Sequence, residues 1–353
     1  MSEKTKELFD SINAKAVLLK APDPNFYYFS GLSVGHFFGT ALILRQGKKP
    51  VLLTTRFYSV PKALRKNLVV KTVENSKKVR KILGQHLKGR RIGLNYNFAT
   101  KKGYADLRKM LKGKAFFDVS KNLAEVRAVK TSGEISKIRT AVGITEKVLQ
   151  RVPKIYRRGM TERALALAIE LEFRQKADDS IGFPVIVASG ANGSVPHHMP
   201  SEKRIGKGFL LVDAGCRYRN YCADLSRTFF VGSATERQRE LYQAVFASQR
   251  FSLSLIKPGE KCSGIFAKAG KFLKSETGFS LIHGLGHGLG IEVHDSPRGF
   301  LEGSNERLKP GMVLTVEPAI YGRFGGIRIE DDILVTKTGC RLLSSAPKKL
   351  VEF

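Results

Sequence analysis

Two aspartates lie inside apolar, strand-like segments that only a short polar stretch separates. The sequence LLVDAGCRYRNYCADLSRTFF holds Asp213 and Asp224, and a turn centred on Tyr218 and Arg219 would join the two segments as a β-hairpin. In that hairpin Asp213 is the pairing partner of Asp224. Directly opposed like charges are destabilising unless a cation lies between them. The hairpin therefore predicts a metal site; the alternative, one exposed aspartate on each strand, is disfavoured by the apolar flanks.

Three of the seven histidines fall in the short segment IHGLGHGLGIEVHDSP. Glycines alternate around His283 and His287 and allow the backbone to pass close to a site. His294 follows in the same segment. Imidazole binds borderline divalent metals and exchanges protons near neutral pH. One such histidine would more often be structural, but three among alternating glycines favour a functional site.

Two glutamates complete a candidate set of metal ligands. Glu317 ends an apolar strand in VLTVEPAI, and the alternation in GGIRIEDDILV puts Arg328 and Glu330 on one face. Either motif alone would be a structural ion pair. The combined set predicts a site for two divalent ions, with the ligands Asp213, Asp224, His287, Glu317 and Glu330. Such an oxygen-rich set suits manganese, cobalt or zinc, and the lack of cysteine ligands argues against a closed structural zinc site.

Length and local patterns predict two domains, because 353 residues exceed the size of one hydrophobic core. Residues 1–122 alternate short strands with helices and predict a smaller α/β domain. Residues 123–353 predict an α+β domain in which helix pairs alternate with antiparallel strands. There we expect helices at 130–152, 161–176, 235–256 and 263–277, with Thr161 as an N-cap. The expected strands cover 185–188, 209–215, 221–231, 290–294, 312–318 and 326–336.

Composition indicates a cytoplasmic protein without membrane spans. The start MSEKTKELFD has no apolar segment behind basic residues, and no stretch is long and apolar enough to cross a bilayer. The four cysteines form no CxxC pair, which fits a reducing compartment.

The formal charge of +30 is unevenly distributed. Residues 1–122 hold 26 basic and 7 acidic side chains, whereas residues 123–353 hold 35 and 24. The carboxylates are therefore concentrated in the part that carries the candidate ligands. The basic N-terminal domain leaves two interpretations open: a contact with nucleic acid, or a solvated basic surface, which is the more common case.

The order of the five candidate ligands resembles that of the pita-bread metallopeptidases, the creatinase, aminopeptidase P and prolidase family. The matching motifs are VDAG, ADLSRTF, GLGHGLG, TVEPAI and IRIED. Within the family the chain most resembles the Xaa-Pro peptidases, prolidase and aminopeptidase P. The match extends from about Leu123 to the C-terminus, and NFYYFSGL resembles the creatinase-type N-terminal domain. The resemblance implies a pita-bread catalytic domain with two divalent ions, manganese before cobalt or zinc, and a homodimer.

The resemblance also implies a role for each metal ligand. Asp213 would bind one ion, Asp224 and Glu330 would bridge the two ions, and His287 and Glu317 would complete the other. A hydroxide that bridges the ions would attack the Xaa–Pro carbonyl carbon, and Glu317 would pass its proton to the prolyl nitrogen.

Other side chains match substrate-contacting or pocket positions of the family. His197 in SGANGSVPHHMPS matches a substrate-contacting histidine, although a shift of one residue would select His198. His294 matches a second such histidine, and both would stabilise the oxyanion. His283 matches a pocket residue of aminopeptidase P, and Arg328 matches an arginine near the metals and the substrate. The expected catalytic residues are Glu317, His197, His294 and Arg328.

Two rival functions remain open at this point. A methionine aminopeptidase shares the order of ligands, but the extra N-terminal domain, the histidine-rich 190–200 segment and Arg328 count against it. A non-catalytic pita-bread protein that binds nucleic acid or protein is the other rival, although such proteins typically lose metal ligands. The sequence does not separate a dipeptidase from an aminopeptidase that acts on longer peptides.

Overall fold

The computed structural model describes residues 2–35, 37, 39–177 and 180–353. The chain divides into two compact units, one ending at Arg127 and the other beginning at Ala128. The first unit therefore reaches beyond Asn122, where we expected the boundary. Each unit has hydrophobic cores of its own. Within the described ranges, no helix is both long enough and apolar enough to cross a membrane.

The first unit is an α/β domain built on one sheet. Its strands are β1 (Ala16–Lys20), β2 (Ala41–Arg45), β3 (Lys48–Thr54), β4 (Val69–Thr72), β5 (Arg91–Leu94) and β6 (Ala115–Asp118). Its helices are α1 (Glu3–Asp10), α2 (Pro24–Ser30), α3 (Lys62–Arg65), α4 (Ser76–His86), α5 (Lys101–Met110) and α6 (Ser120–Ala128).

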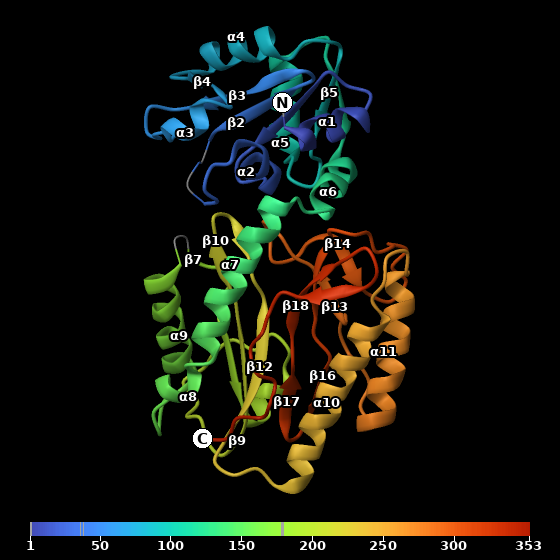
Figure 1. The fold of residues 1–353 in the computed structure, drawn as a ribbon. Coiled ribbons are helices and arrows are strands. Elements are labelled where there is room, and N and C mark those ends of the chain that lie inside the picture. Colours follow the sequence, from blue (N-terminus) through green and yellow to red (C-terminus); the bar gives the residue numbers. More distant parts are fainter. Residues whose placement is uncertain (1, 36, 38, 178–179) are drawn as a thin grey trace. The chain divides into compact units, whose positions relative to one another are not determined.

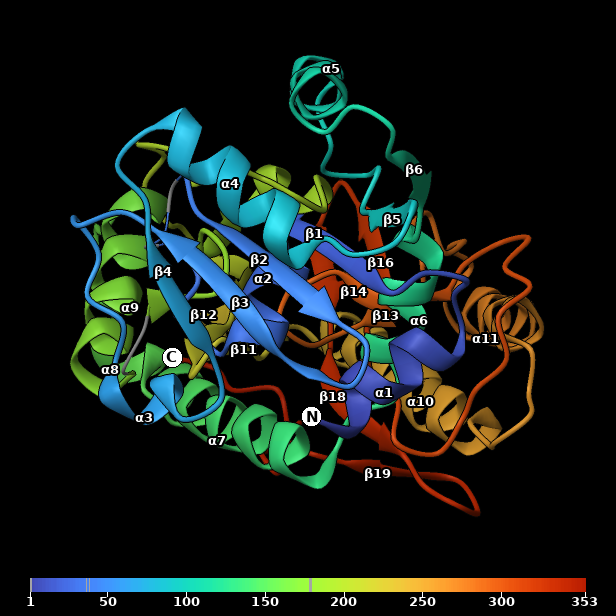
Figure 2. The ribbon, with the colours of Figure 1, turned by 90° about the horizontal axis from the view of Figure 1, so that it is seen from above.

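The sheet of the first unit is mixed and has the strand order β4-β3-β2-β1-β5-β6. Its central strands β1, β2 and β3 are antiparallel, whereas β4, β5 and β6 pair in parallel with their neighbours. Alternate residues of β1 face opposite sides. Val17 and Leu19 pack with α1, α2 and α6, while Leu18 packs with α4 and α5. Helices therefore bury both faces of the sheet, and Figure 2 shows α4 on one face and α2 on the other.

The second unit combines antiparallel strands with long helices. Its helices are α7 (Ser132–Leu149), α8 (Val152–Ile155), α9 (Glu162–Lys176), α10 (Glu236–Leu255), α11 (Cys262–Thr277) and the 3₁₀ helix η1 (Gly190–Ser194). The strands before α10 are β7 (Ser180–Ile181), β8 (Ile186–Ser189), β9 (Gly208–Ala214), β10 (Cys216–Tyr218), β11 (Tyr221–Cys222) and β12 (Leu225–Val231). The later strands are β13 (Gly286–Gly288), β14 (Asp295–Phe300), β15 (Val313–Val316), β16 (Ala319–Gly322), β17 (Gly325–Arg328), β18 (Asp331–Val335) and β19 (Cys340–Leu342).

The long helices of the second unit flank its strands. In Figure 1, α7, α8 and α9 lie on one side of the strands, and α10 and α11 lie on the other. The strands form small sheets of order β12-β9-β8, β14-β13-β15-β18-β19 and β16-β17. Thr161 accepts a hydrogen bond from the Ala164 amide at the start of α9, so the predicted N-cap is confirmed. The α+β class expected for this unit is also confirmed.

The hairpin that carries Asp213 and Asp224 forms with a register that differs from the expected one. Its turn consists of Arg219 and Asn220, which have φ values of 46° and 73°. Asp213 consequently pairs with Ser226 and not with Asp224. A two-residue hairpin turn of type I′ requires positive φ at both central positions, and asparagine adopts such a conformation more readily than most residues. Both carboxylates nevertheless face one cavity.

The predicted strand at 290–294 is wrong. The chain there forms a tight loop between β13 and β14 that folds around the Asp295 carboxylate. This carboxylate accepts hydrogen bonds from the amides of Ile291 (3.0 Å) and Ser296 (2.6 Å). A Cβ atom at Gly290 would lie 2.3 Å from Asp295 Oδ2. An aspartate side chain that bonds nearby amides competes with strand pairing, which explains the difference.

Candidate active site

All five candidate metal ligands line one cavity of about 610 Å³ in the second unit. Asp213 lies in β9, and Asp224 directly precedes β12. His287 lies in β13, and Glu317 directly follows β15. Glu330 lies between β17 and β18. The ligand atoms of Asp224, His287 and Glu330 lie within 4.8 Å of one another. Groups from segments that are remote in the chain therefore meet in one place.

Glycines allow the strand of His287 to approach its neighbours closely. A Cβ atom at Gly286 would lie 2.0 Å from the Thr315 carbonyl oxygen. One at Gly288 would lie 2.2 Å from the carbonyl oxygen of Pro297. Real Cβ contacts are never this short, so β13 can lie between β14 and β15 only with glycine at these positions. The alternating glycines of the sequence thus place His287 inside the cavity.

His287 presents its Nε2 atom to two carboxylates. Nε2 lies 3.6 Å from Asp224 Oδ2 and 3.7 Å from Glu317 Oε1. The Nδ1 atom lies 3.2 Å from the Gly288 carbonyl oxygen, which can only accept, so Nδ1 carries the proton. Burial, and then the neighbouring His294, lower the pKa of His287 to about 3. The ring is therefore neutral and has a free Nε2 lone pair, the form that binds a metal.

The carboxylates of the cavity are buried with little opposing positive charge. Burial, and then the neighbouring carboxylates, raise the pKa values of Asp224 and Glu330 well above their ordinary range. Burial also raises the pKa of Glu317 to about 8, although Arg328 opposes the shift. The Oδ1 atoms of Asp213 and Asp224 are buried and have no hydrogen-bond partner among the described residues. The site therefore holds more buried carboxylates than the single guanidinium of Arg328 can balance.

Divalent cations fit this donor set. Four carboxylates, two of which have a buried oxygen without a hydrogen-bond partner among the described residues, and one neutral imidazole supply hard and borderline ligands, and no thiolate is present among them. Bound cations would stabilise the ionised carboxylates that burial alone disfavours.

Arg328 is a buried arginine that fixes two of the candidate ligands. Its Nη2 donates a hydrogen bond to Asp213 Oδ2 across 2.7 Å. Its Nε donates to Ser226 Oγ (2.7 Å), and that hydroxyl donates to Glu330 Oε2 (2.6 Å). The fork geometry of the guanidinium thus sets the orientation of both carboxylates.

A directional chain of hydrogen bonds links Arg328 to His283. Arg328 Nη1 donates to the Tyr321 hydroxyl oxygen (2.9 Å), which lies 2.9 Å from His283 Nε2. His283 Nδ1 lies 2.7 Å from the Gly284 carbonyl oxygen and so donates to it. Burial lowers the pKa of His283 to about 4, so the ring is neutral and its Nε2 accepts the tyrosine proton. Tyr321 thereby holds His283 in a single orientation.

A second cavity, of about 300 Å³, shares lining residues with the first. His197 and His294 line both cavities, as do Glu317 and Arg328. The rings of His294 and His287 are 4.0 Å apart, edge to face. His198 lines only the larger cavity, and its Nε2 lies 2.8 Å from the Glu162 carboxylate. The geometry therefore favours His197 over its neighbour as the histidine that faces both cavities.

Two residues of the site were missed at the sequence level. Tyr321 shares a face with Arg328, because Ala319 pairs with Arg328 in the β16–β17 hairpin and Tyr321 follows Ala319 by two residues. Strand alternation therefore contained a usable signal for Tyr321. Arg298 lines the smaller cavity. Its position in the sequence, eleven residues after His287, does not indicate that it reaches this cavity.

Comparisons with known proteins agree with this arrangement. Residues 136–337, more than half of the chain, match the sequence model of metallopeptidase family M24. The chain belongs to metallopeptidase family M24. Residues 2–129 match the creatinase/prolidase N-terminal domain. The pita-bread fold and the metallopeptidase class expected from the sequence are thus confirmed, and the family implies divalent metal ions.

Similar M24 proteins cover the whole chain. The Xaa-Pro dipeptidase of Pyrococcus horikoshii is 32% identical over 99% of both chains. The Xaa-Pro dipeptidase of Pyrococcus furiosus is 33% identical, also over 99% of both chains. The crystal structure of an X-Pro aminopeptidase from Thermotoga maritima superposes with a TM-score of 0.89, 27% identity and coverage of 98% and 99%.

Proposed function

We propose that this M24 metallopeptidase hydrolyses the peptide bond that precedes proline, and that it acts chiefly on dipeptides. One observation carries the proposal: the five candidate ligands line a cavity that shares His197, His294 and Glu317 with a smaller second cavity. The likeness to Xaa-Pro dipeptidases over 99% of both chains supports the same substrate class.

We assign the metal ions to residues 123–353, with manganese preferred to cobalt or zinc. When bound, the ions activate water and polarise the substrate carbonyl group. Asp224 and Glu330 would hold the ions together with His287, and the closeness of the ligand atoms of these three residues supports this role. Asp213 and Glu317 supply the remaining ligands.

The protein's side chains would move the proton and hold the carbonyl oxygen. The Xaa–Pro bond is a tertiary amide, so the leaving prolyl nitrogen must receive a proton. Glu317 faces both cavities and is the proposed carrier of that proton. His197 and His294 also face both cavities, where their imidazoles would donate hydrogen bonds to the developing oxyanion.

Arg298 supports dipeptides over longer peptides as substrates. Arg298 lines the smaller cavity together with His283 and Leu301, and it is exposed to solvent. A guanidinium pairs well with a carboxylate, often through two hydrogen bonds. In an Xaa-Pro dipeptide the carboxylate belongs to the proline itself, one residue beyond the cleaved bond. Arg298 is therefore the proposed partner of the substrate C-terminus.

A peptide panel tests this function. Metal-free protein is supplied with manganese, cobalt or zinc and assayed with Ala-Pro, Ala-Pro amide, Ala-Pro-Ala and Met-Ala. We expect Ala-Pro to be hydrolysed fastest and its amide much more slowly. Faster cleavage of Ala-Pro-Ala would assign an aminopeptidase, and cleavage of Met-Ala alone would assign a methionine aminopeptidase. No hydrolysis of any peptide would favour a binding protein.

Cellular setting and oligomeric state form a further part of the proposal. We propose a cytoplasmic homodimer. None of the four cysteines forms a disulfide bond, which supports a reducing compartment. Size-exclusion chromatography with light scattering tests the dimer.

An added contact with nucleic acid is proposed for the first unit. Helices α4 and α5 cover one face of its sheet. Their exposed basic residues are Lys77, Arg80, Lys81, Lys101, Lys102, Arg108 and Lys109. Such a surface attracts phosphate backbones in a salt-dependent manner. Retention on RNA that salt weakens would support the contact, and absence of retention at low salt would exclude it.

A further inference from the structure

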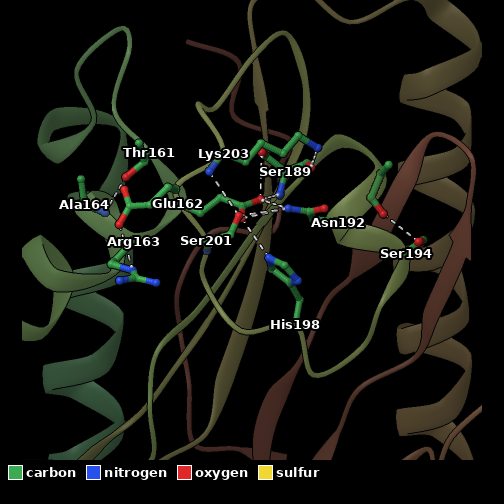
Figure 3. Close-up of polar contacts among 12 residues, drawn as sticks. Thr161, Glu162, Arg163, Ala164, Ser189, Asn192, Ser194, His198, Ser201 and Lys203 are labelled. Carbon is green, nitrogen blue, oxygen red and sulfur yellow. Dashed lines mark hydrogen bonds and ion pairs between the residues drawn. The ribbon is translucent and has the colours of Figure 1, made fainter.

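A buried carboxylate outside the metal cluster organises the segment that carries His197. Glu162 is the first residue of α9, and its side chain is fully buried. Figure 3 shows this carboxylate surrounded by polar side chains from residues 189–203. This clamp, as we call the Glu162 carboxylate and its partners, has no role in the proposed chemistry.

The clamp consists of short hydrogen bonds to four residues of one segment. Ser189 donates through its amide (2.8 Å) and hydroxyl (3.1 Å), and Ser201 through its amide (3.2 Å) and hydroxyl (2.7 Å). Asn192 Nδ2 lies 3.1 and 3.0 Å from the two carboxylate oxygens. His198 Nε2 lies 2.8 Å away. Burial alone would raise the pKa of Glu162, but these bonds outweigh it and lower the pKa to about 2, so the carboxylate is ionised.

The first turn of α9 reinforces the clamp. The Glu162 amide donates to the Lys203 carbonyl oxygen (3.1 Å), and the Arg163 amide donates to that of Ser201 (3.0 Å). Helix N-termini have free amides, so here the segment supplies their acceptors. One helix end thus binds the segment through both its backbone and its side chain.

The opposite side of the segment lies against β17. A Cβ atom at Gly193 would lie 2.8 Å from the Gly326 amide nitrogen, so η1 and β17 touch backbone to backbone. Further along, Arg328 Nη1 donates to the Pro196 carbonyl oxygen across 3.2 Å. The segment is therefore held by α9 on one side and by the strand of Arg328 on the other.

We propose that Glu162 is a positioning residue that acts on catalysis through His197. The two neighbours of His197 are both fixed: Pro196 by Arg328 and His198 by Glu162. The side chain of His197 lies between these two contacts and lines both cavities. Loss of the clamp releases His197 on one side, while the candidate metal ligands, which lie on other segments, keep their places. This inference rests on the proposed function, since turnover reports on His197.

A double-mutant cycle tests the coupling. Glu162→Gln is measured alone and together with His197→Ala, with Glu172→Gln as a control on the same helix, where the carboxylate pairs with Arg151 and Lys176 and has no contact with the clamp. We expect Glu162→Gln to lower kcat/KM for Ala-Pro about 10- to 100-fold, the cost of a misplaced catalytic group. In the His197→Ala background the same change should have almost no effect. Bound metal per chain should equal that of the wild type in every variant.

Hydrogen exchange provides a readout that is independent of turnover. Amides of 190–201 should exchange faster in Glu162→Gln and at the wild-type rate in Glu172→Gln. Equal losses of kcat/KM in both backgrounds, loss of metal, or unchanged exchange would each overturn the inference. If circular dichroism shows that Glu162→Gln is unfolded, Ser201→Ala, which removes the 2.7 Å bond, takes its place in the cycle.

Failure of the proposed function can be told apart from failure of the clamp. If the wild-type protein cleaves no Xaa-Pro peptide, the proposed function fails, and the exchange rates alone decide on the clamp. Faster exchange in Glu162→Gln would then support the clamp, and unchanged exchange would overturn it.

Discussion

The guanidinium of Arg328 donates a hydrogen bond to the carboxylate of Asp213 across 2.7 Å, and both side chains are buried. Through this contact the protein supplies positive charge to a group of buried carboxylates. Neighbouring Asp213 and Glu330 in turn hold the pKa of Arg328 above its ordinary value, although burial opposes this. Removal of this charge would therefore leave the Asp213 carboxylate buried without its cationic partner.

Arg328→Met should destabilise the protein strongly. Removing one partner of a buried ion pair leaves an uncompensated charge and costs about 3–5 kcal/mol of unfolding free energy. Unfolding by guanidinium chloride measures this change in the metal-free protein. Arg239→Met is the control, because Arg239 pairs with Glu352 near the surface and should cost about 0–1 kcal/mol. Equal losses for the two variants would contradict the account.

The metal-free protein should lose stability as pH rises from about 6.5 to 8. Burial raises the pKa of Glu317 to about 8, so the folded chain holds a proton that the unfolded chain has released. A group whose pKa is higher in the folded than in the unfolded chain stabilises the folded protein while it is protonated. This stability is lost as pH rises through the folded-state pKa. The pKa values of His287 and His283 are lowered in the folded protein. These two histidines therefore reduce the stability of the protein only as pH falls below about 6.5, the ordinary pKa of histidine.

Denaturant unfolding in the presence of a chelator measures this pH dependence. Each retained proton gives a slope of about 1.4 kcal/mol per pH unit. Glu317→Gln should reduce the slope, and saturating manganese should abolish it, because bound cations hold the carboxylates ionised. A stability that rises between pH 6.5 and 8 in the metal-free wild type would contradict the prediction.

Glu317→Gln should abolish turnover and leave the fold largely intact. The amide keeps the size of the side chain but cannot carry the proton to the prolyl nitrogen. A general acid–base group contributes about 10²- to 10⁴-fold to the rate, so kcat should fall at least that far. Stopped-flow assays with Ala-Pro measure kcat, and circular dichroism checks the fold. Activity equal to that of the wild type would remove Glu317 from this role.

Gly288→Ala should disrupt the metal site through steric contact alone. The new Cβ would lie 2.2 Å from the Pro297 carbonyl oxygen, so β13 must move away from β14 and take His287 with it. Forced overpacking typically costs about 1–3 kcal/mol. Gly264→Ala on α11 is the matched control, since its Cβ would meet nothing within 4 Å. The first variant should lose thermal stability and manganese affinity, whereas the second should keep its manganese affinity and lose no thermal stability, since alanine favours the helix over glycine.

Arg298→Gln should weaken the binding of dipeptides and spare that of their amides. Loss of a guanidinium that pairs with the substrate carboxylate should raise KM for Ala-Pro about tenfold or more, since a hydrogen bond to a charged group contributes about 1.5–3 kcal/mol. KM for Ala-Pro amide should stay the same, because that substrate has no terminal carboxylate. Equal increases of KM for both peptides would refute the assignment.

The sequence predicted the face of each candidate ligand better than the pairing of its strands. The turn at Arg219 and Asn220 lies one residue later than expected, so the pairing of Asp213 moves from Asp224 to Ser226. Moving a turn by one residue shifts the partner by two, and side chains alternate with a period of two. The carboxylates therefore still face one cavity.

Features that depend on remote contacts were not predictable. The loop at 290–294 folds around the Asp295 carboxylate. The alternation of apolar residues does not indicate that this side chain binds the nearby amides. In the sequence Glu162 is simply the residue after the N-cap Thr161. Its hydrogen-bond partners lie much later in the chain, between Ser189 and Ser201. Arg298 enters the smaller cavity only because β14 pairs with β13. Tertiary structure alone brings these groups to the site.

The most direct test of the account is a titration of the metal-free protein with manganese, in which hydrolysis of Ala-Pro is followed after each addition. We predict that activity is absent without metal, rises with added ion and levels off at two ions per chain. Full hydrolysis without any divalent ion, or no hydrolysis with manganese, cobalt or zinc in excess, would contradict the central claim that these five side chains hold the catalytic metals.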